Sequence, residues 1–305
     1  MGGCCSLIRR KKYEQSGSKF KVIDGRRFQI LDDSNYTLPN DAGEEERLDI
    51  QHFVLKHAFN GNFSAPVDQL LRKGGARVLD VGCGSGIWTF ELAKEYPKSH
   101  FVGIDLAPVN LKDEKLSNVE FIEYNVLDGL PFESNSFDYV FARALVAVYT
   151  RSQWTELAIP EYTRIIKPGG WLELMEWDTV LKGGAANVKR MNNALIGMCD
   201  QKDLIAAPGY EIQSFLEQSG HYTNIGYEQK PVPIGPKGEK YAEMAIRDWR
   251  DVWQGLKLIF SSVMQVSGEH YDAISEAAVG ELIKSGVIWE NMRAWGQKKD
   301  RIYTD

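Results

Sequence analysis

The sequence predicts an α/β fold in which a mostly parallel sheet is covered by helices on both faces, and two observations predict it. Apolar runs typical of buried strands alternate with segments of helix length between residues 77 and 177. The first run, 77–82, ends in a loop with glycines at alternate positions, and a helix begins directly afterwards at Ile87. Strands separated by helix-length crossovers lie parallel in one sheet, which helices cover on both sides.

The elements of this core follow in order along the chain. After strand 77–82 and a helix at 87–96, strands are expected at 100–106, 119–125 and 137–143, then a helix at 152–166 and a strand at 171–177. Pro160 should kink the helix that contains it, because proline removes a helical hydrogen bond.

The pattern changes beyond the core. Helices are expected at 185–202 and 210–219, followed by a strand, a turn and a strand over 221–234. Apolar residues from Ala245 to Val266 then recur every three or four positions. This spacing predicts one long amphipathic helix, despite Gly255.

The residues before the core divide into two regions. Residues 1–34 are polar and basic without periodicity, so we expect a flexible leader. Residues 35–75 are expected to form a helical lid, with helices at about 44–59 and at 67–73. One face of the longer helix carries Leu48, His52, Leu55 and Phe59.

Charge is distributed unevenly along the chain. Residues 1–30 hold eight Lys or Arg and two acidic residues, whereas the whole chain has a net charge of −6. The body of the protein is therefore strongly acidic. Because polyanions bind basic surfaces, we expect no nucleic acid partner for the folded body.

The first six residues, Met1-Gly2-Gly3-Cys4-Cys5-Ser6, match the pattern for N-myristoylation of Gly2. Palmitoylation of Cys4 or Cys5 and the basic residues at 9–12 would strengthen such an anchor. The sequence therefore predicts a cytoplasmic protein held at the inner face of a membrane, with an ordinary solvated leader as the alternative.

The cysteines indicate neither a disulfide framework nor a metal site. They stand at positions 4, 5, 83 and 199, which is not a metal-ligand spacing, so we expect no metal and a reducing compartment. No run of eighteen apolar residues is present, so we expect no transmembrane helix.

The glycine loop indicates which ligand is bound. Its spacing is G-x-G-x-G, with Asp80 before the first glycine, and this is one residue too short for the dinucleotide fingerprint. A nicotinamide oxidoreductase is therefore disfavoured. The second strand delivers Asp105 nineteen residues after Gly86, where a carboxylate can accept both ribose hydroxyls.

This combination resembles the S-adenosylmethionine site of class I methyltransferases. Four further blocks follow in the order of that family, namely 119–125, 129–132, 136–140 and 167–171. The segment Arg47–His52 resembles the region before the catalytic domain in a fungal group related to secondary-metabolism regulators. The resemblance implies a methyltransferase core at 76–235, a helical insertion near 183–219, an antiparallel last strand and a C-terminal helical region at 236–305.

The resemblance also implies the residues that hold S-adenosylmethionine. The methionine end would be held by the loop, the ribose by Asp105, and the adenine by the residues after the second and third strands. These residues are Asp80, Gly82, Cys83, Gly84, Gly86, Asp105, Leu106, Asn125 and Val126. The family commonly has aspartate where Asn125 stands, so Asp128 is the alternative contact for adenine.

Four residues are candidates for catalysis by the same resemblance. Arg143 would lie beside the transferred methyl group, and Glu176 is the nearest carboxylate for a general base. Tyr36 and His52 would belong to the active-site lid, or else simply pack in it. The methyl acceptor, a small molecule, a lipid-like compound or a protein, is not identified. The alternative function is a membrane-tethered pseudo-enzyme that binds S-adenosylmethionine and acts as an interaction protein.

Overall fold

The computed structural model describes residues 20–29, 37–107, 116–236 and 241–300. Tyr36, Gly2, Cys4 and Cys5 lie outside these ranges. Within them, no helix is both long enough and apolar enough to cross a membrane.

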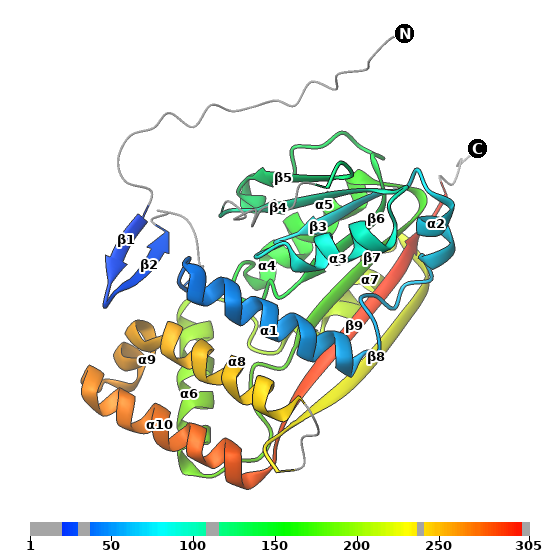
Figure 1. Cartoon of the computed structure of the whole chain (residues 1–305). Coiled ribbons are helices and arrows are strands. Elements are labelled where there is room, and N and C mark those ends of the chain that lie inside the picture. Colours follow the sequence, from blue (N-terminus) through cyan, green and yellow to red (C-terminus); the bar gives the residue numbers. More distant parts are fainter. Residues whose placement is uncertain (1–19, 30–36, 108–115, 237–240, 301–305) are drawn as a thin grey trace.

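A seven-stranded sheet forms the centre of the molecule, with the strand order β5-β4-β3-β6-β7-β9-β8 (Figure 1). Five strands are parallel to one another: β3 (Arg77–Val81), β4 (His100–Asp105), β5 (Val119–Glu123), β6 (Phe137–Arg143) and β7 (Ile166–Trp177). The last strand, β9 (Val287–Lys298), runs antiparallel between β7 and β8 (Tyr222–Ile234). The expected α/β sheet with an antiparallel last strand is thus confirmed.

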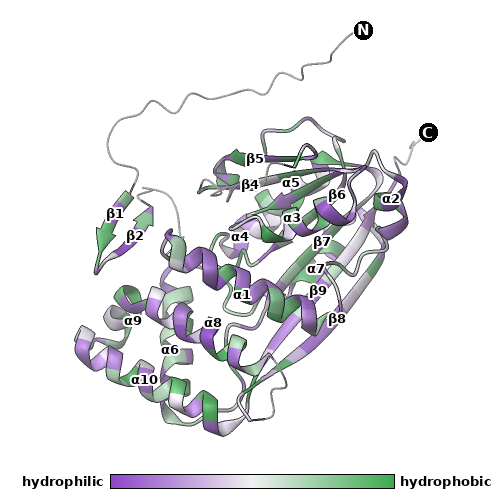
Figure 2. Ribbon diagram, in the orientation of Figure 1, coloured by the Kyte–Doolittle hydropathy of each residue, from purple (hydrophilic) through white to green (hydrophobic). Residues whose placement is uncertain are grey.

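Helices cover both faces of the sheet, as expected. One face packs against α1 (Ala42–Ala58), α2 (Asp68–Lys73), α3 (Ile87–Glu95), α6 (Ala186–Gln201) and three C-terminal helices: α8 (Ala242–Gly255), α9 (Lys257–Met264) and α10 (Gly268–Ser285). The other face packs against α5 (Ile159–Ile165) and α7 (Ile212–Ser219), and the short helix α4 (Arg151–Gln153) precedes α5 in the chain. Figure 2 shows hydrophobic and hydrophilic residues on most helices, and hydrophilic stretches along β8 and β9.

The helix expected at 152–166 is not regular. It runs from α4 through a π-helical turn at Trp154–Ala158 and continues as α5, with Pro160 in the first turn of α5. Proline cannot donate a backbone hydrogen bond, so the irregularity lies where Pro160 was expected to disturb the helix.

Three expectations about the C-terminal part were wrong. The single helix expected from Ala245 to Val266 is broken at Leu256, between α8 and α9. At Gly255 an added Cβ would approach Pro39 Cδ to 3.0 Å, so the break lies where the lid segment packs closely against the helix. The region 221–234 is one edge strand, β8, in which two prolines are tolerated because an edge needs fewer ladder bonds. The expected helical region 236–305 ends in a strand, β9.

The leader was expected to be without structure, and residues 20–29 contradict this. They form a hairpin of β1 (Phe20–Ile23) and β2 (Arg26–Gln29), joined by Asp24 and Gly25, which both have positive φ. A two-residue Asp-Gly turn matches the twist of a hairpin, so this dipeptide was the signal that was missed. Arg26 pairs with Asp41 at 2.7 Å and attaches the hairpin to the start of α1.

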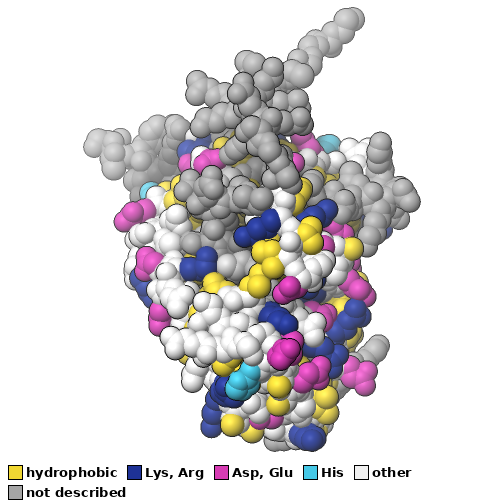
Figure 3. Space-filling view, turned by 90° about the vertical axis from the view of Figure 1, so that its left-hand side faces the viewer, with side chains coloured by type: hydrophobic (Ala, Val, Ile, Leu, Met, Phe, Trp, Pro, Cys, Tyr) yellow, Lys and Arg dark blue, Asp and Glu magenta, His cyan; other side chains and the backbone are white. Residues whose placement is uncertain are grey.

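Charged side chains of both signs are interspersed on the face shown in Figure 3, which carries the C-terminal helices in the part not covered by grey residues. No large patch of one sign is visible there.

Candidate active site

The loop after β3 begins the candidate site. Gly82, Gly84 and Gly86 have φ values of 65°, 55° and 77°, a left-handed conformation that only glycine adopts readily. The backbone N–H of Gly84 donates to Asp105 Oδ2 at 2.8 Å, and Ala107 N donates to Oδ1 at 2.9 Å. The carboxylate at the end of β4 is therefore fixed beside the glycine loop.

A cavity, here called the first cavity, opens over this loop. Most of the residues predicted to bind the cofactor line it, and so does one residue predicted for catalysis: Gly82, Gly84, Asp105, Leu106, Asn125, Val126 and Arg143. Among the described residues, Asp128 does not line this cavity, whereas Asn125 does. Of the two alternative contacts predicted for adenine, the lining therefore favours Asn125.

Three of the predicted cofactor-binding residues lie next to the first cavity but are not part of its lining as the described residues define it. Asp80 is buried behind the loop and accepts a hydrogen bond from Thr89 Oγ1 at 2.6 Å. Burial raises its pKa to about 6, and the Thr89 bond opposes this shift. Cys83 points its thiol toward Gly103, whose added Cβ would meet Sγ at 2.9 Å, and burial raises the pKa of this thiol. Gly86 forms the N-cap of α3.

Other lining residues were missed. Ser85 lies in the loop, and its buried hydroxyl has no hydrogen-bond partner in the described part of the chain. Gln29 reaches in from the hairpin and donates from Nε2 to Leu106 O at 3.2 Å. Leu48 of α1 also lines the cavity and would lie 3.0 Å from a Cβ added to Gly84. Only Ser85 had a local signal, since it stands between two of the glycines.

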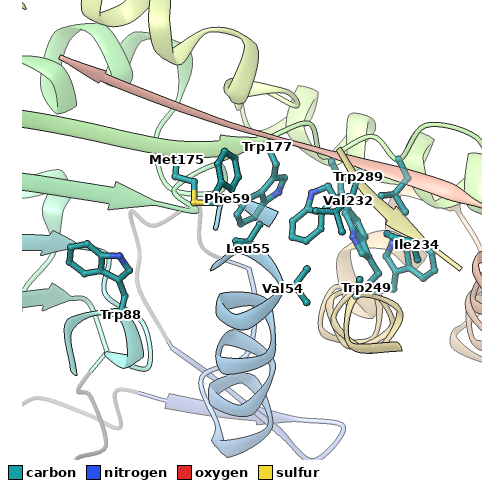
Figure 4. Packing of buried hydrophobic residues seen from close by; sticks show 14 of the residues in the cluster. Val54, Leu55, Phe59, Trp88, Met175, Trp177, Val232, Ile234, Trp249 and Trp289 are labelled. Carbon is teal, nitrogen blue, oxygen red and sulfur yellow. The ribbon is translucent and has the colours of Figure 1, made fainter. Parts of the chain in front are cut away.

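A second cavity adjoins the first and shares Leu48 and Ala144 with it. Its walls are largely apolar and include Trp177, Trp249 and Trp289. These indoles pack edge to face, with ring centroids 5.4 Å apart for Trp177 and Trp289 and 5.8 Å apart for Trp249 and Trp289. Figure 4 shows the three tryptophans grouped between the sheet and the helices.

The charged residues that line the second cavity belong to a buried cluster between α1 and α8. Arg47 donates from Nη1 to Asp248 Oδ1 at 2.7 Å and from Nη2 to Glu44 Oε1 at 2.6 Å. Gln51 donates to Asp248 Oδ2 at 3.3 Å. Burial raises the pKa of Asp248 to about 6, and the Arg47 guanidinium opposes the shift. The cluster thus places a carboxylate that is charged at neutral pH in an apolar cavity.

Arg143 is oriented by a chain of polar groups. Its Nη1 lies 3.2 Å from His52 Nδ1, and His52 Nε2 lies 3.0 Å from Glu91 Oε2. An arginine can only donate, so Nδ1 must accept and Nε2 must carry the proton that it donates to Glu91. Burial lowers the pKa of His52 to about 4, so the ring is neutral as this arrangement requires. His52 therefore acts on the first cavity through Arg143, since the described lining does not include it.

The neutral state of His52 predicts a pH dependence of stability. The unfolded chain binds a proton on this histidine below about pH 6.5, whereas the folded protein does so only below about pH 4. The contribution of neutral His52 to the stability of the folded protein is therefore fully present above pH 6.5 and is lost as the pH falls through 4. Between pH 7 and pH 5 it should account for about 2 kcal/mol of unfolding free energy. In denaturant unfolding, the free energy of unfolding of His52→Gln should fall less between pH 7 and pH 5 than that of the wild type. The exposed control His221→Gln should keep the pH dependence of the wild type.

Glu176 does not suit the role of general base that was predicted for it. It is fully buried and accepts a hydrogen bond from Leu145 N at 2.6 Å. Burial raises its pKa to about 8, so the side chain is protonated at neutral pH. Glu176 is not among the described residues that line either cavity. It holds the backbone after β6 in place.

Comparison with known proteins gives a consistent set of relatives. Residues 78–170 match the family described as "Methyltransferase domain". Methyltransferase str3 of Strobilurus tenacellus is 32% identical over 206 residues, which cover 66% of this chain and 71% of the relative. Methyltransferase pytC of Aspergillus terreus is 27% identical over 238 residues, covering 75% of this chain and 70% of the relative. Secondary metabolism regulator laeA of Aspergillus fumigatus is 25% identical over 234 residues, covering 74% and 60%.

Proposed function

Because the chain belongs to the class I S-adenosylmethionine-dependent methyltransferases, we propose that it methylates a small molecule bound in the second cavity. The observation that carries the proposal is that this cavity adjoins the one over the glycine loop through Leu48 and Ala144. Most of its lining residues are buried, which favours a small acceptor over a protein surface. The relatives give no support to a pseudo-enzyme. Transfer of tritiated methyl groups into a small-molecule extract, with mass spectrometry of the labelled product, tests the activity.

The residues of the first cavity fit S-adenosylmethionine. The left-handed glycines leave the loop backbone open to a ligand, and the unpartnered Ser85 hydroxyl offers a hydrogen bond. We assign the methionine end to Gly82, Gly84 and Arg143, and the ribose to Asp105. Leu106, Asn125 and Val126 would hold the adenine. S-adenosylmethionine supplies an electrophilic methyl group on a sulfonium sulfur.

The chain's own contribution is orientation and exclusion of water. Helix α1 covers the glycine loop through Leu48 and continues into the wall of the second cavity. Burial lowers the pKa of Arg143 to about 10, so its guanidinium remains charged and can bind a carboxylate. Holding two reactants in adjoining cavities removes much of the entropic barrier to their reaction.

Replacing Asp105 by alanine should weaken the binding of S-adenosylhomocysteine about ten- to a hundredfold. A carboxylate that accepts charge-assisted hydrogen bonds in a closed site contributes about 1.5 to 3 kcal/mol. Titration calorimetry measures the effect. Asp138→Ala is the matched control, because Asp138 also accepts from a backbone N–H, that of Arg77 at 2.8 Å, but lies near the start of β6, whereas Asp105 lies at the end of β4. Equal affinities of the wild type and Asp105→Ala would remove Asp105 from the site.

We also propose that the N-terminal residues hold the protein at the cytoplasmic face of a membrane. The support is the sequence at Gly2, Cys4 and Cys5 and the basic residues that follow. One myristoyl chain binds bilayers only at about 10⁴ M⁻¹, so a second signal is required. In fractionated cells, Gly2→Ala and Cys4→Ser/Cys5→Ser forms should move to the cytosol. A wild type that is wholly cytosolic, with Gly2 unacylated by mass spectrometry, would contradict the proposal.

A further inference from the structure

The second cavity contains groups that none of the predicted catalytic residues supplies. Among the described residues that line it, Asp248 is the only carboxylate. The indole N–H groups of Trp249 and Trp289 are also buried in its wall, and neither has a hydrogen-bond partner in the described structure. Buried donors are normally satisfied, and a ligand with its own acceptor atoms would supply the partners that the protein does not give these two indoles.

These features define the chemistry of the occupant. Three tryptophan rings favour a flat aromatic molecule, which buries a large area against them. The free indole N–H groups favour an oxygen acceptor on that molecule, and their positive edges disfavour a cation. The carboxylate of Asp248 accepts from Arg47 and Gln51 and retains lone pairs for one further donor.

Asp248 is connected through a hydrogen bond to the helix that borders both cavities. Its partner Gln51 lies one helical turn after Leu48 on α1, so both side chains project from the same face of that helix. Leu48 lines both cavities. The hydrogen bond with Gln51 thus ties the carboxylate to the helix that borders both cavities.

We propose, resting on the proposed function, that the second cavity binds a planar aromatic compound with a ring hydroxyl, and that Asp248 accepts the proton of that hydroxyl during methyl transfer. The hydroxyl oxygen forms the new O–C bond while the C–S bond breaks and its electron pair stays on sulfur. The proton passes to the Asp248 carboxylate and is later released to water. The products are an aryl methyl ether and S-adenosylhomocysteine.

The charged groups around Asp248 allow this role. Arg47 and Glu44 face it from α1, and the Arg47 guanidinium keeps the carboxylate ionised at neutral pH despite burial. A carboxylate whose pKa is raised by burial is a stronger base than an exposed one, which suits it to accept a phenolic proton.

The test uses 7-hydroxycoumarin and 7-methylcoumarin, which share one planar ring system and differ in the donor. With S-adenosylhomocysteine present, the wild type should bind the hydroxyl compound at least tenfold more tightly, as measured by calorimetry. Asp248→Asn should abolish this preference. Asp251→Asn, the same change three residues later on α8 and outside both cavity linings as described, should retain it.

Tritium transfer from S-adenosylmethionine to bound 7-hydroxycoumarin should fall about a hundredfold in Asp248→Asn, the usual contribution of a general base. Equal binding of the two coumarins, binding of neither, or no label on the bound hydroxyl compound would overturn the inference. Transfer of the label to 7-aminocoumarin but not to 7-hydroxycoumarin would also overturn the inference. The same sample is also tested for binding of S-adenosylhomocysteine. If it binds this cofactor product but fails the coumarin tests, the inference about the second cavity is wrong while the proposed function stands.

Discussion

Gly82→Ala is expected to weaken the binding of S-adenosylhomocysteine more than a hundredfold. Gly82 has a φ of 65°, and a Cβ at this position would lie 2.5 Å from Leu145 Cδ2. The left-handed conformation costs an alanine about 1 to 2 kcal/mol, and overpacking adds about 1 to 3 kcal/mol. Leu145 also lines the first cavity, and its N–H is held by Glu176. Relief of the clash therefore moves this side chain toward the space that the cofactor needs.

Gly75→Ala is the matched control for Gly82→Ala. Gly75 has a φ of 78°, yet nothing lies within 4 Å of an added Cβ. Both variants therefore carry backbone strain, and thermal unfolding should show this cost in each, with the cost of overpacking added in Gly82→Ala alone. Only Gly82→Ala should lose affinity in calorimetry. If both variants bind the cofactor product as the wild type does, the loop is not the binding site.

Glu173→Leu is expected to lower the free energy of unfolding by about 3 to 5 kcal/mol. Glu173 and Arg293 are both fully buried, with Oε1 and Nε 3.6 Å apart. The carboxylate also accepts from Ser64 N at 3.0 Å, Ala65 N at 2.8 Å and Tyr139 Oη at 3.0 Å. Removing one member of a buried pair leaves an uncompensated charge, which is the larger part of the cost. Urea unfolding followed by circular dichroism measures the change.

The double variant Glu173→Leu/Arg293→Met identifies the cause. If the cost comes from the orphaned guanidinium, the double variant should be less destabilised than the sum of the two single variants by at least about 1 kcal/mol. Simple additivity would show instead that the hydrogen bonds to the segment 64–65 carry the effect.

The core of the fold could be predicted from the sequence because its signals are local. Each strand from β3 to β7 contains a short stretch that is apolar or alternates apolar with polar residues, and the loop at Gly82–Gly86 contains its own turn residues. β9 was missed because it carries Glu290, Asn291 and Arg293 among its apolar residues. Their burial is stabilised by partners far away in the chain, such as Glu173 for Arg293, and no local pattern reveals such a pairing.

The part of the site that lies in a local motif could also be predicted from the sequence, whereas the second cavity could not. Asp105 and the glycines belong to one strand-loop-helix unit, so their position follows from the motif. The second cavity combines Leu48 of the lid, Ala144 after β6, Met198 of α6 and Asp248 of α8. These residues meet only in the folded protein. Glu176 shows the converse, because a carboxylate at the end of a strand reads as functional until burial and the Leu145 bond are seen.

The position of β9 has a consequence for the order in which the chain can fold during synthesis. It lies between β7 and β8, both of which leave the ribosome before it. Until residues 287–298 emerge, the nascent chain has two strand edges with open backbone groups, and unpaired edges of this kind promote association with other chains. Glu173 likewise waits for Arg293 as its counter-ion. The parallel half of the sheet can assemble early, whereas closure of the sheet has to wait for β9.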